Sequence, residues 1–148
     1  MLDAKTLEAL RGYAQRIQHP VQIKLYNGAH PKRDDLIAFL KQVASVSDLI
    51  SIDHSQTNVP VREGLTFELM SEGVPSGVFF SGIPGGHEFS SFVLALLQVG
   101  GNPIRLDAAL QRQIQALNEP LSFESIVSLD CHICPDVVQL FNLSLIHI

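Results

Sequence analysis

The sequence predicts an α/β protein built from two related units, of which the first is complete and the second incomplete. Over residues 1–101, segments with helical spacing alternate with short strand-like segments. The pattern then starts again at residue 102, and both cysteines of the chain lie in this second part, in the segment DCHICP. A repeated unit that carries a cysteine pair in one copy only is the organisation we expect.

The first unit opens with a helix near Asp3, and Pro20 ends it. Its apolar residues fall on one face at helical spacing, namely Leu7, Leu10, Ala14 and Ile17. The segment VQIKLY follows and alternates apolar with polar residues, as a half-buried strand does. A helix and a strand therefore come first.

The rest of the first unit reads as a helix, a strand, a hairpin and a final helix. The second helix turns apolar residues inward, namely Leu36, Ile37, Leu40, Val43 and Ala44. DLISID is a short strand, and LTFELM and VFFSG form the hairpin. The final helix buries Phe89, Phe92, Val93 and Leu96. Gly100 and Gly101 end it. A leading helix apart, this is the order of a thioredoxin-like fold.

A thioredoxin-like fold usually has a cis-proline before its hairpin strand. Here Gly64 stands directly before LTFELM, and Pro60 lies four residues earlier. We expect a unit without a cysteine pair to have little need of that proline.

The second unit repeats the start of the first at an offset of one hundred residues. Residues 102–120 predict a helix, with Leu106, Leu110, Ile114 and Leu117 on one face. Pro120 then aligns with Pro20, and LSFESIVSLD aligns with the strand VQIKLY. The next helix starts at about Pro135, and the sequence ends before the remaining strands. The predicted units are residues 1–101 and 102–142.

The two cysteines lie between the predicted strand and the helix that follows it. A thiol at a helix N-terminus faces unpaired backbone N–H groups and the positive end of the dipole, and both stabilise a thiolate. We expect Cys131 to be the attacking thiol and Cys134 the resolving thiol. His132 lies between them and is a candidate for tuning the thiolate. A zinc site and a pair of inert core cysteines remain open, although one C-x-x-C supplies only two zinc ligands.

Glu88, in the segment GIPGGHEFSS, is a second candidate. Its ordinary interpretation is an acidic residue in the first turn of a helix, favoured by the dipole. Its functional interpretation is a carboxylate that handles protons or tunes the redox pair.

Composition excludes several function classes. The net charge of −5 at pH 7 disfavours nucleic acid and anionic membranes as partners. The longest apolar run is too short to span a bilayer, and the start lacks the features of a signal peptide. We expect a cytoplasmic protein, where a disulfide is more often catalytic than structural.

The segments NVPVR, GHEFSSFVLALLQVGGNP and FESIVSLDCHICPDVVQ resemble the N-terminal region of the flavoprotein component of alkyl hydroperoxide reductase, which reduces a peroxiredoxin. The resemblance covers the chain up to about Asn142. It implies tandem thioredoxin-like folds in which only the second keeps its redox pair, here Cys131 and Cys134. This family usually has a small polar residue at the position of Ile133 and a proline at that of Gly64.

The resemblance also implies cofactors and partners. Electrons would come from a C-terminal module that carries FAD and uses NADH, and would pass to the peroxiredoxin for peroxide detoxification. The full-length protein would be a homodimer. Residues 1–148 contain no G-x-G-x-x-G fingerprint, so we expect no cofactor on this part and no activity from it alone.

Two other functions are compatible with the pattern. One is a stand-alone tandem-thioredoxin disulfide oxidoreductase, and the other is a protein-binding module with incidental cysteines. The last residues, LSLIHI, match a translated sequencing-library adapter, so we expect residues 143–148 to be a non-native tail.

Overall fold

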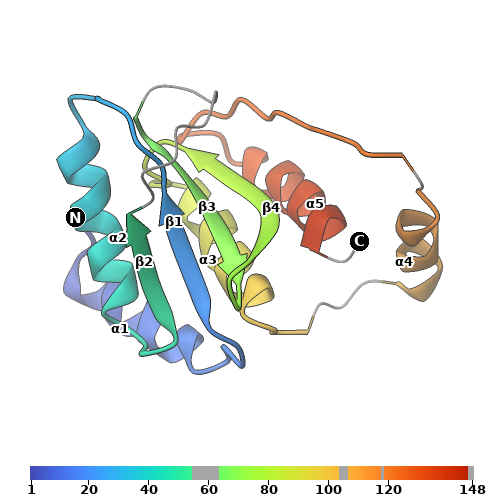
Figure 1. Ribbon diagram of the computed structural model, residues 1–148, viewed down its shortest axis with the longest axis horizontal. Coiled ribbons are helices and arrows are strands. Elements are labelled where there is room, and N and C mark those ends of the chain that lie inside the picture. Colours follow the sequence, from blue (N-terminus) through green and yellow to red (C-terminus); the bar gives the residue numbers. More distant parts are fainter. Residues whose placement is uncertain (55–63, 104–106, 118, 147–148) are drawn as a thin grey trace.

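The computed structural model describes residues 1–54, 64–103, 107–117 and 119–146. Its helices and strands follow the predicted order through the first unit (Figure 1). The elements are α1 (Ala4–Ala14), β1 (Val21–Leu25), α2 (Arg33–Ala44), β2 (Ile50–His54), β3 (Thr66–Ser71), β4 (Val74–Ser81), α3 (Glu88–Val99), α4 (Ala108–Gln115) and α5 (Cys134–Ile146). The thioredoxin-like order of the first unit is confirmed.

The first unit forms a four-stranded sheet in the order β2-β1-β3-β4. β1 runs parallel to β2 and antiparallel to β3, and β3 pairs antiparallel with β4. The parallel pair needs a crossover, which α2 supplies, whereas Glu72 and Gly73 join β3 to β4 in a tight turn. Both of these turn residues have positive φ. The β-α-β unit (β1, α2 and β2) and the β3–β4 hairpin are therefore joined by the pairing of the two central strands, β1 and β3.

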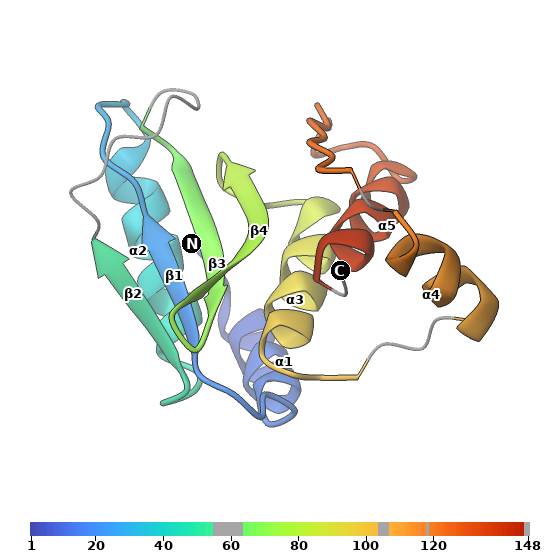
Figure 2. The ribbon, with the colours of Figure 1, turned by 45° about the vertical axis from the view of Figure 1, so that its right-hand side comes forward.

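The core lies between the sheet and the helices of the first unit. β1 turns Val21, Ile23 and Leu25 toward it, in the predicted alternation. Phe92 of α3 is fully buried, and its ring packs against four others at separations typical of aromatic pairs. The partners are Phe39 at 5.6 Å, Phe67 at 5.9 Å, Phe80 at 5.6 Å and Phe89 at 6.4 Å between centroids. α3 packs against β3, and α5 lies alongside α3 (Figure 2).

The predicted start of α1 near Asp3 and the predicted end of α3 are confirmed, but α1 ends at Ala14 and not at Pro20, so Ile17 lies beyond this helix. The Asp3 carboxylate accepts a hydrogen bond from the Thr6 backbone N–H at 2.7 Å, which caps α1. Gly101, with φ of +87°, follows the end of α3, where its N–H donates to the Gln98 carbonyl. None of the described helices is long and apolar enough to cross a membrane.

The predicted strand in LSFESIVSLD is wrong. Residues 121–128 are extended but belong to no sheet, and Phe123 and Ile126 are 52% and 82% exposed. A strand needs a neighbour to take up its backbone hydrogen bonds, and the described residues provide none there.

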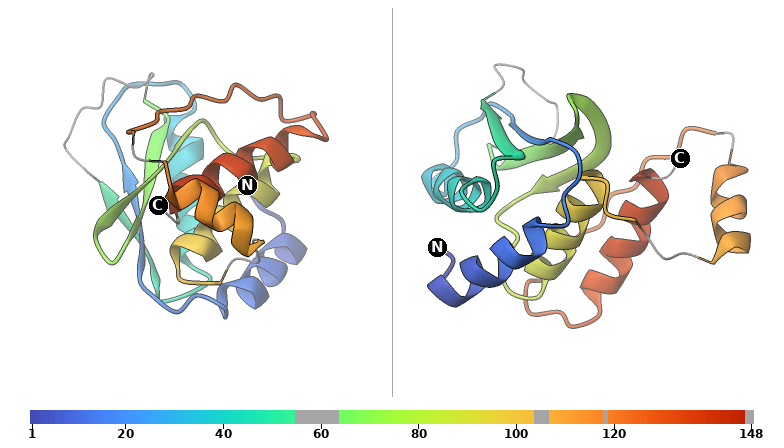
Figure 3. Two further views of the ribbon diagram at one scale, coloured as in Figure 1. Left: turned by 90° about the vertical axis from the view of Figure 1, so that its right-hand side faces the viewer. Right: turned by 90° about the horizontal axis from the view of Figure 1, so that it is seen from below.

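The predicted helix over 102–120 is also too long, because α4 spans only Ala108–Gln115 and buries no side chain. Leu106 lies outside the described residues. Figure 3 shows α4 standing apart from the rest of the molecule.

α5 joins the second unit to the first. It packs along α3 and against β4, and its helical conformation continues through Ser144 to Ile146. Leu145 and Ile146 are partly buried against the core of the first unit. Residues 143–146 therefore extend the helix beyond Asn142, and His147 lies outside the described residues.

Gly64, at the position where the resemblance implies a proline, permits a close backbone approach. Its φ is +72°, and a Cβ there would lie 2.9 Å from backbone atoms of Gly28 and Ala29. Arg33 stabilises the backbone around Gly64, because its guanidinium donates hydrogen bonds to the carbonyls of Gly64 and Tyr26 at 2.5 and 2.8 Å. The described residues contain no cis peptide bond, and Pro60 lies outside them. The hairpin forms with glycine at this position.

Tyr26 makes the stability of the first unit sensitive to alkaline pH. Burial, together with its 2.5 Å hydrogen bond to Glu68, raises the pKa of Tyr26 from 10.0 to about 12. The folded state thus favours the neutral phenol, so this contribution is complete below pH 10 and is lost as the pH rises through about 12. We expect chemical denaturation across this range to show a larger loss of stability for the wild type than for Tyr26→Phe. Equal losses would contradict the assignment.

Candidate functional site

Cys131 and Cys134 form a disulfide at the start of α5, with their Cα atoms 5.5 Å apart. Cys134 is the first residue of the helix, which agrees with the predicted start at about Pro135. Pro135 is buried in the first turn, where a residue without an N–H is tolerated. Both cysteines are half-buried. The pair is therefore partly open to solvent at a helix N-terminus.

The helix terminus interacts directly with the first cysteine. The backbone N–H of Cys134 donates to the Sγ of Cys131 at 3.2 Å. This donor and the positive end of the helix dipole would both favour a negative sulfur at Cys131 after reduction. The geometry thus supports Cys131, rather than Cys134, as the thiolate.

The cysteine loop is seated on the first unit at the N-terminus of α3. The N–H of His87 donates to the Leu129 carbonyl at 3.1 Å. Gly86, with φ of +54°, lets the two backbones approach, because a Cβ on it would lie 2.6 Å from the Leu129 oxygen. The segment GGH therefore fixes the position of the cysteine loop.

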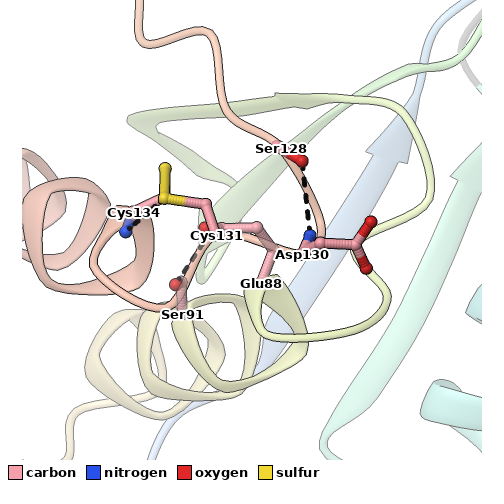
Figure 4. The surroundings of a disulfide bond; sticks show 6 residues. All are labelled: Glu88, Ser91, Ser128, Asp130, Cys131 and Cys134. Carbon is pink, nitrogen blue, oxygen red and sulfur yellow. Dashed lines mark hydrogen bonds between the residues drawn. A yellow bond between two sulfur atoms is a disulfide. The ribbon is translucent and has the colours of Figure 1, made fainter.

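Glu88 comes from the same turn and is buried. Its Oε2 accepts a hydrogen bond from the Ser91 hydroxyl at 3.0 Å, while its Oε1 has no hydrogen-bond partner among the described residues. Figure 4 shows Glu88 and Ser91 among the residues that surround the disulfide. An incompletely bonded buried carboxylate is unusual in an ordinary helix turn.

His132, the other predicted tuning residue, contacts a residue that the sequence patterns do not single out. The ring centroids of His87 and His132 lie 4.2 Å apart. The fold therefore brings Glu88 and His132 to the disulfide, together with His87. The only sequence signal for His87 is its place next to Glu88 in GGHE.

The described residues contain no group of three or more His, Cys, Asp or Glu side chains arranged to hold a metal ion. A separate apolar groove of about 480 Å³ lies between α5 and the extended segment before the cysteines. Phe123 and Phe141 meet there with ring centroids 4.8 Å apart. It is lined by residues of the second unit together with Ser144 and Leu145.

Comparison with known proteins shows to which region of which proteins the chain is similar. No family model matches the chain. It is 43% identical over 145 residues to the AhpF component of alkyl hydroperoxide reductase of Pseudomonas putida, and 38% identical over 143 residues to a protein named NADH dehydrogenase of Bacillus subtilis. The NTD_N/C domain of the alkyl hydroperoxide reductase AhpF of Enterococcus faecalis superposes with a TM-score of 0.85 at 28% identity, covering 99% of this chain and 75% of that one. The chain corresponds to the N-terminal region of AhpF.

The predicted resemblance to this family is confirmed over nearly the whole chain. Each of the two relatives matches 97% of it, and the chain spans 27% of their length. A protein disulfide oxidoreductase of Aeropyrum pernix shares the fold, with a TM-score of 0.76 at 19% identity over 97% of this chain and 68% of that one. The tandem thioredoxin-like fold class is therefore confirmed.

Proposed function

We propose that the chain is the dithiol–disulfide electron-transfer arm of an NADH-dependent, FAD-containing peroxiredoxin reductase, and that it passes electrons to the peroxiredoxin of alkyl hydroperoxide reductase. The observation that carries this proposal is the Cys131–Cys134 disulfide at the N-terminus of α5, in a chain that corresponds to the N-terminal region of AhpF. The incidental-cysteine alternative has no comparable support.

The proposed chemistry is two successive thiol–disulfide exchanges. In the reduced arm, the Cys131 thiolate attacks one sulfur of the peroxiredoxin disulfide, and the other peroxiredoxin sulfur leaves as a thiolate that takes up a proton. Cys134 then loses its proton and attacks the Sγ of Cys131. This restores the intramolecular disulfide and releases the second peroxiredoxin thiol. Two electrons move per cycle, and the arm is oxidised as the peroxiredoxin is reduced.

The remaining parts of this proposal concern the longer protein. FAD and NADH would bind outside residues 1–148, in the portion of the relatives that this chain does not span. That module would reduce the Cys131–Cys134 disulfide, and the whole protein would act as a cytoplasmic homodimer.

The test is direct electron transfer to the proposed partner. The 148-residue chain is reduced, freed of reductant and mixed with an oxidised bacterial peroxiredoxin, and thiols are counted on both proteins. We expect one peroxiredoxin disulfide to be reduced for each arm disulfide formed. Transfer to small disulfides but not to peroxiredoxin would instead favour a stand-alone disulfide oxidoreductase.

We further propose that Glu88 handles a proton in these exchanges, because it is a buried, incompletely bonded carboxylate beside the redox pair. Glu88→Gln keeps the shape of the side chain and removes its ability to take up a proton. We expect it to slow transfer to peroxiredoxin by about a hundredfold, within the range of general acid–base catalysis. Ser91→Ala is the matched control, since it removes only the hydrogen bond to Oε2. Equal rates for Glu88→Gln and the wild type would contradict the role.

A further inference from the structure

Two imidazole rings from different units meet beside the disulfide. His87 directly precedes α3 in the first unit, and His132 lies between the two cysteines of the second. Their ring centroids lie 4.2 Å apart, with the planes inclined at 58°. We propose that His87 is a positioning residue of the redox site, which holds the imidazole of His132 in place next to Cys131. This inference rests on the proposed function of the cysteine pair.

Backbone hydrogen bonds hold in place the two segments that carry His87 and His132. The hydrogen bond from the His87 N–H to the Leu129 carbonyl ties the start of α3 to the redox loop. The Cys131 N–H donates in turn to the Ser128 carbonyl at 3.0 Å, which closes the loop just before His132. Both histidines are exposed, so their meeting is not a consequence of burial in a core. A surface imidazole without such a neighbour would sample several rotamers.

Holding the ring of His132 matters because this residue is adjacent to Cys131 in the chain. A protonated imidazole near a thiolate stabilises it, and the size of the effect depends on the distance and direction of the ring. By limiting the positions of His132, His87 would fix the electrostatic environment of the attacking sulfur. The first unit, which has no cysteines, would thus contribute to the chemistry of the second.

The test measures the reactivity of the reduced pair in the 148-residue chain toward the coloured disulfide dithiobis(nitrobenzoate). His87→Ala removes the ring, His87→Phe keeps a ring that cannot be protonated, and His54→Ala removes an exposed histidine elsewhere. At about pH 7, we expect His87→Ala to react about threefold more slowly, because the imidazole of His132 is no longer held beside Cys131, with the other two variants near the wild type.

A double-variant experiment separates a positioning role of His87 from a general effect on the structure. In a His132→Ala background, His87→Ala should change the rate no further, because the two residues act through one contact. If His87→Ala matches the wild type, the inference is wrong while the proposed function stands. If the reduced wild-type pair does not react at all, the proposed function fails and the inference with it.

Discussion

Replacing Cys131 with serine should abolish electron transfer to the peroxiredoxin. A serine hydroxyl is not ionised near neutral pH and cannot form a disulfide, so neither exchange step can begin. We expect the rate in the complete reductase to fall by at least roughly a thousandfold, as when a nucleophile is removed from an enzyme. The measurement is NADH oxidation coupled to peroxiredoxin and a peroxide, with direct NADH oxidation by the flavin module as an internal reference.

Cys134→Ser is the matched control for this prediction. It leaves the attacking thiol in place and removes the resolving thiol, so the reaction should stop at the mixed disulfide. We expect a covalent complex between Cys131 and the peroxiredoxin, detectable by mass spectrometry and released by added thiol. A complex that forms instead through Cys134 in the Cys131→Ser variant would reverse the two roles. Undiminished turnover of Cys131→Ser would refute the proposed function.

The second large effect concerns the aromatic core. Phe92→Ala removes a fully buried ring from between Phe39, Phe67 and Phe80. We expect a loss of about 4 kcal/mol in the free energy of unfolding, because the cavity adds to the lost burial. This is a large part of the roughly 5–15 kcal/mol typical of a whole domain, so we expect partial unfolding at physiological temperature. Urea denaturation followed by circular dichroism measures it.

Phe79→Ala provides the comparison within the same chain. Phe79 lies on the opposite side of β4 from Phe80, is 45% exposed and makes a stacked contact with Tyr26 at 6.1 Å between centroids. We expect its loss to cost less than about 1 kcal/mol. Comparable losses for the two variants would mean that the core is not centred on Phe92.

Local patterns sufficed to predict most of the first unit. The alternation in VQIKLY identifies β1, and the helical spacing from Leu36 to Val43 identifies α2, because each pattern reports which side of a local segment is buried. The two glycines after α3 mark where that helix ends for reasons that lie in their own backbone, whereas α1 ends at Ala14, well before Pro20. These features need no knowledge of the rest of the chain.

The second unit shows where this reasoning fails. LSFESIVSLD has apolar residues suited to a strand, yet it lies outside the sheet, since its backbone has no neighbouring strand with which to pair among the described residues. Residues 102–120 have helical spacing, but α4 covers only Ala108–Gln115, and none of the side chains of this helix is buried. Pattern alone cannot show whether a segment has something to pack against.

The sequence by itself determined the chemistry that the protein can carry: a C-x-x-C pair at a helix start, and the family to which that segment points. The tertiary structure alone decided what surrounds the pair. Glu88 and His87 are more than forty residues from the cysteines in the sequence, and they reach the disulfide because α5 packs along α3. Such contacts depend on the packing of distant elements, and local spacing carries no information about which distant elements will meet.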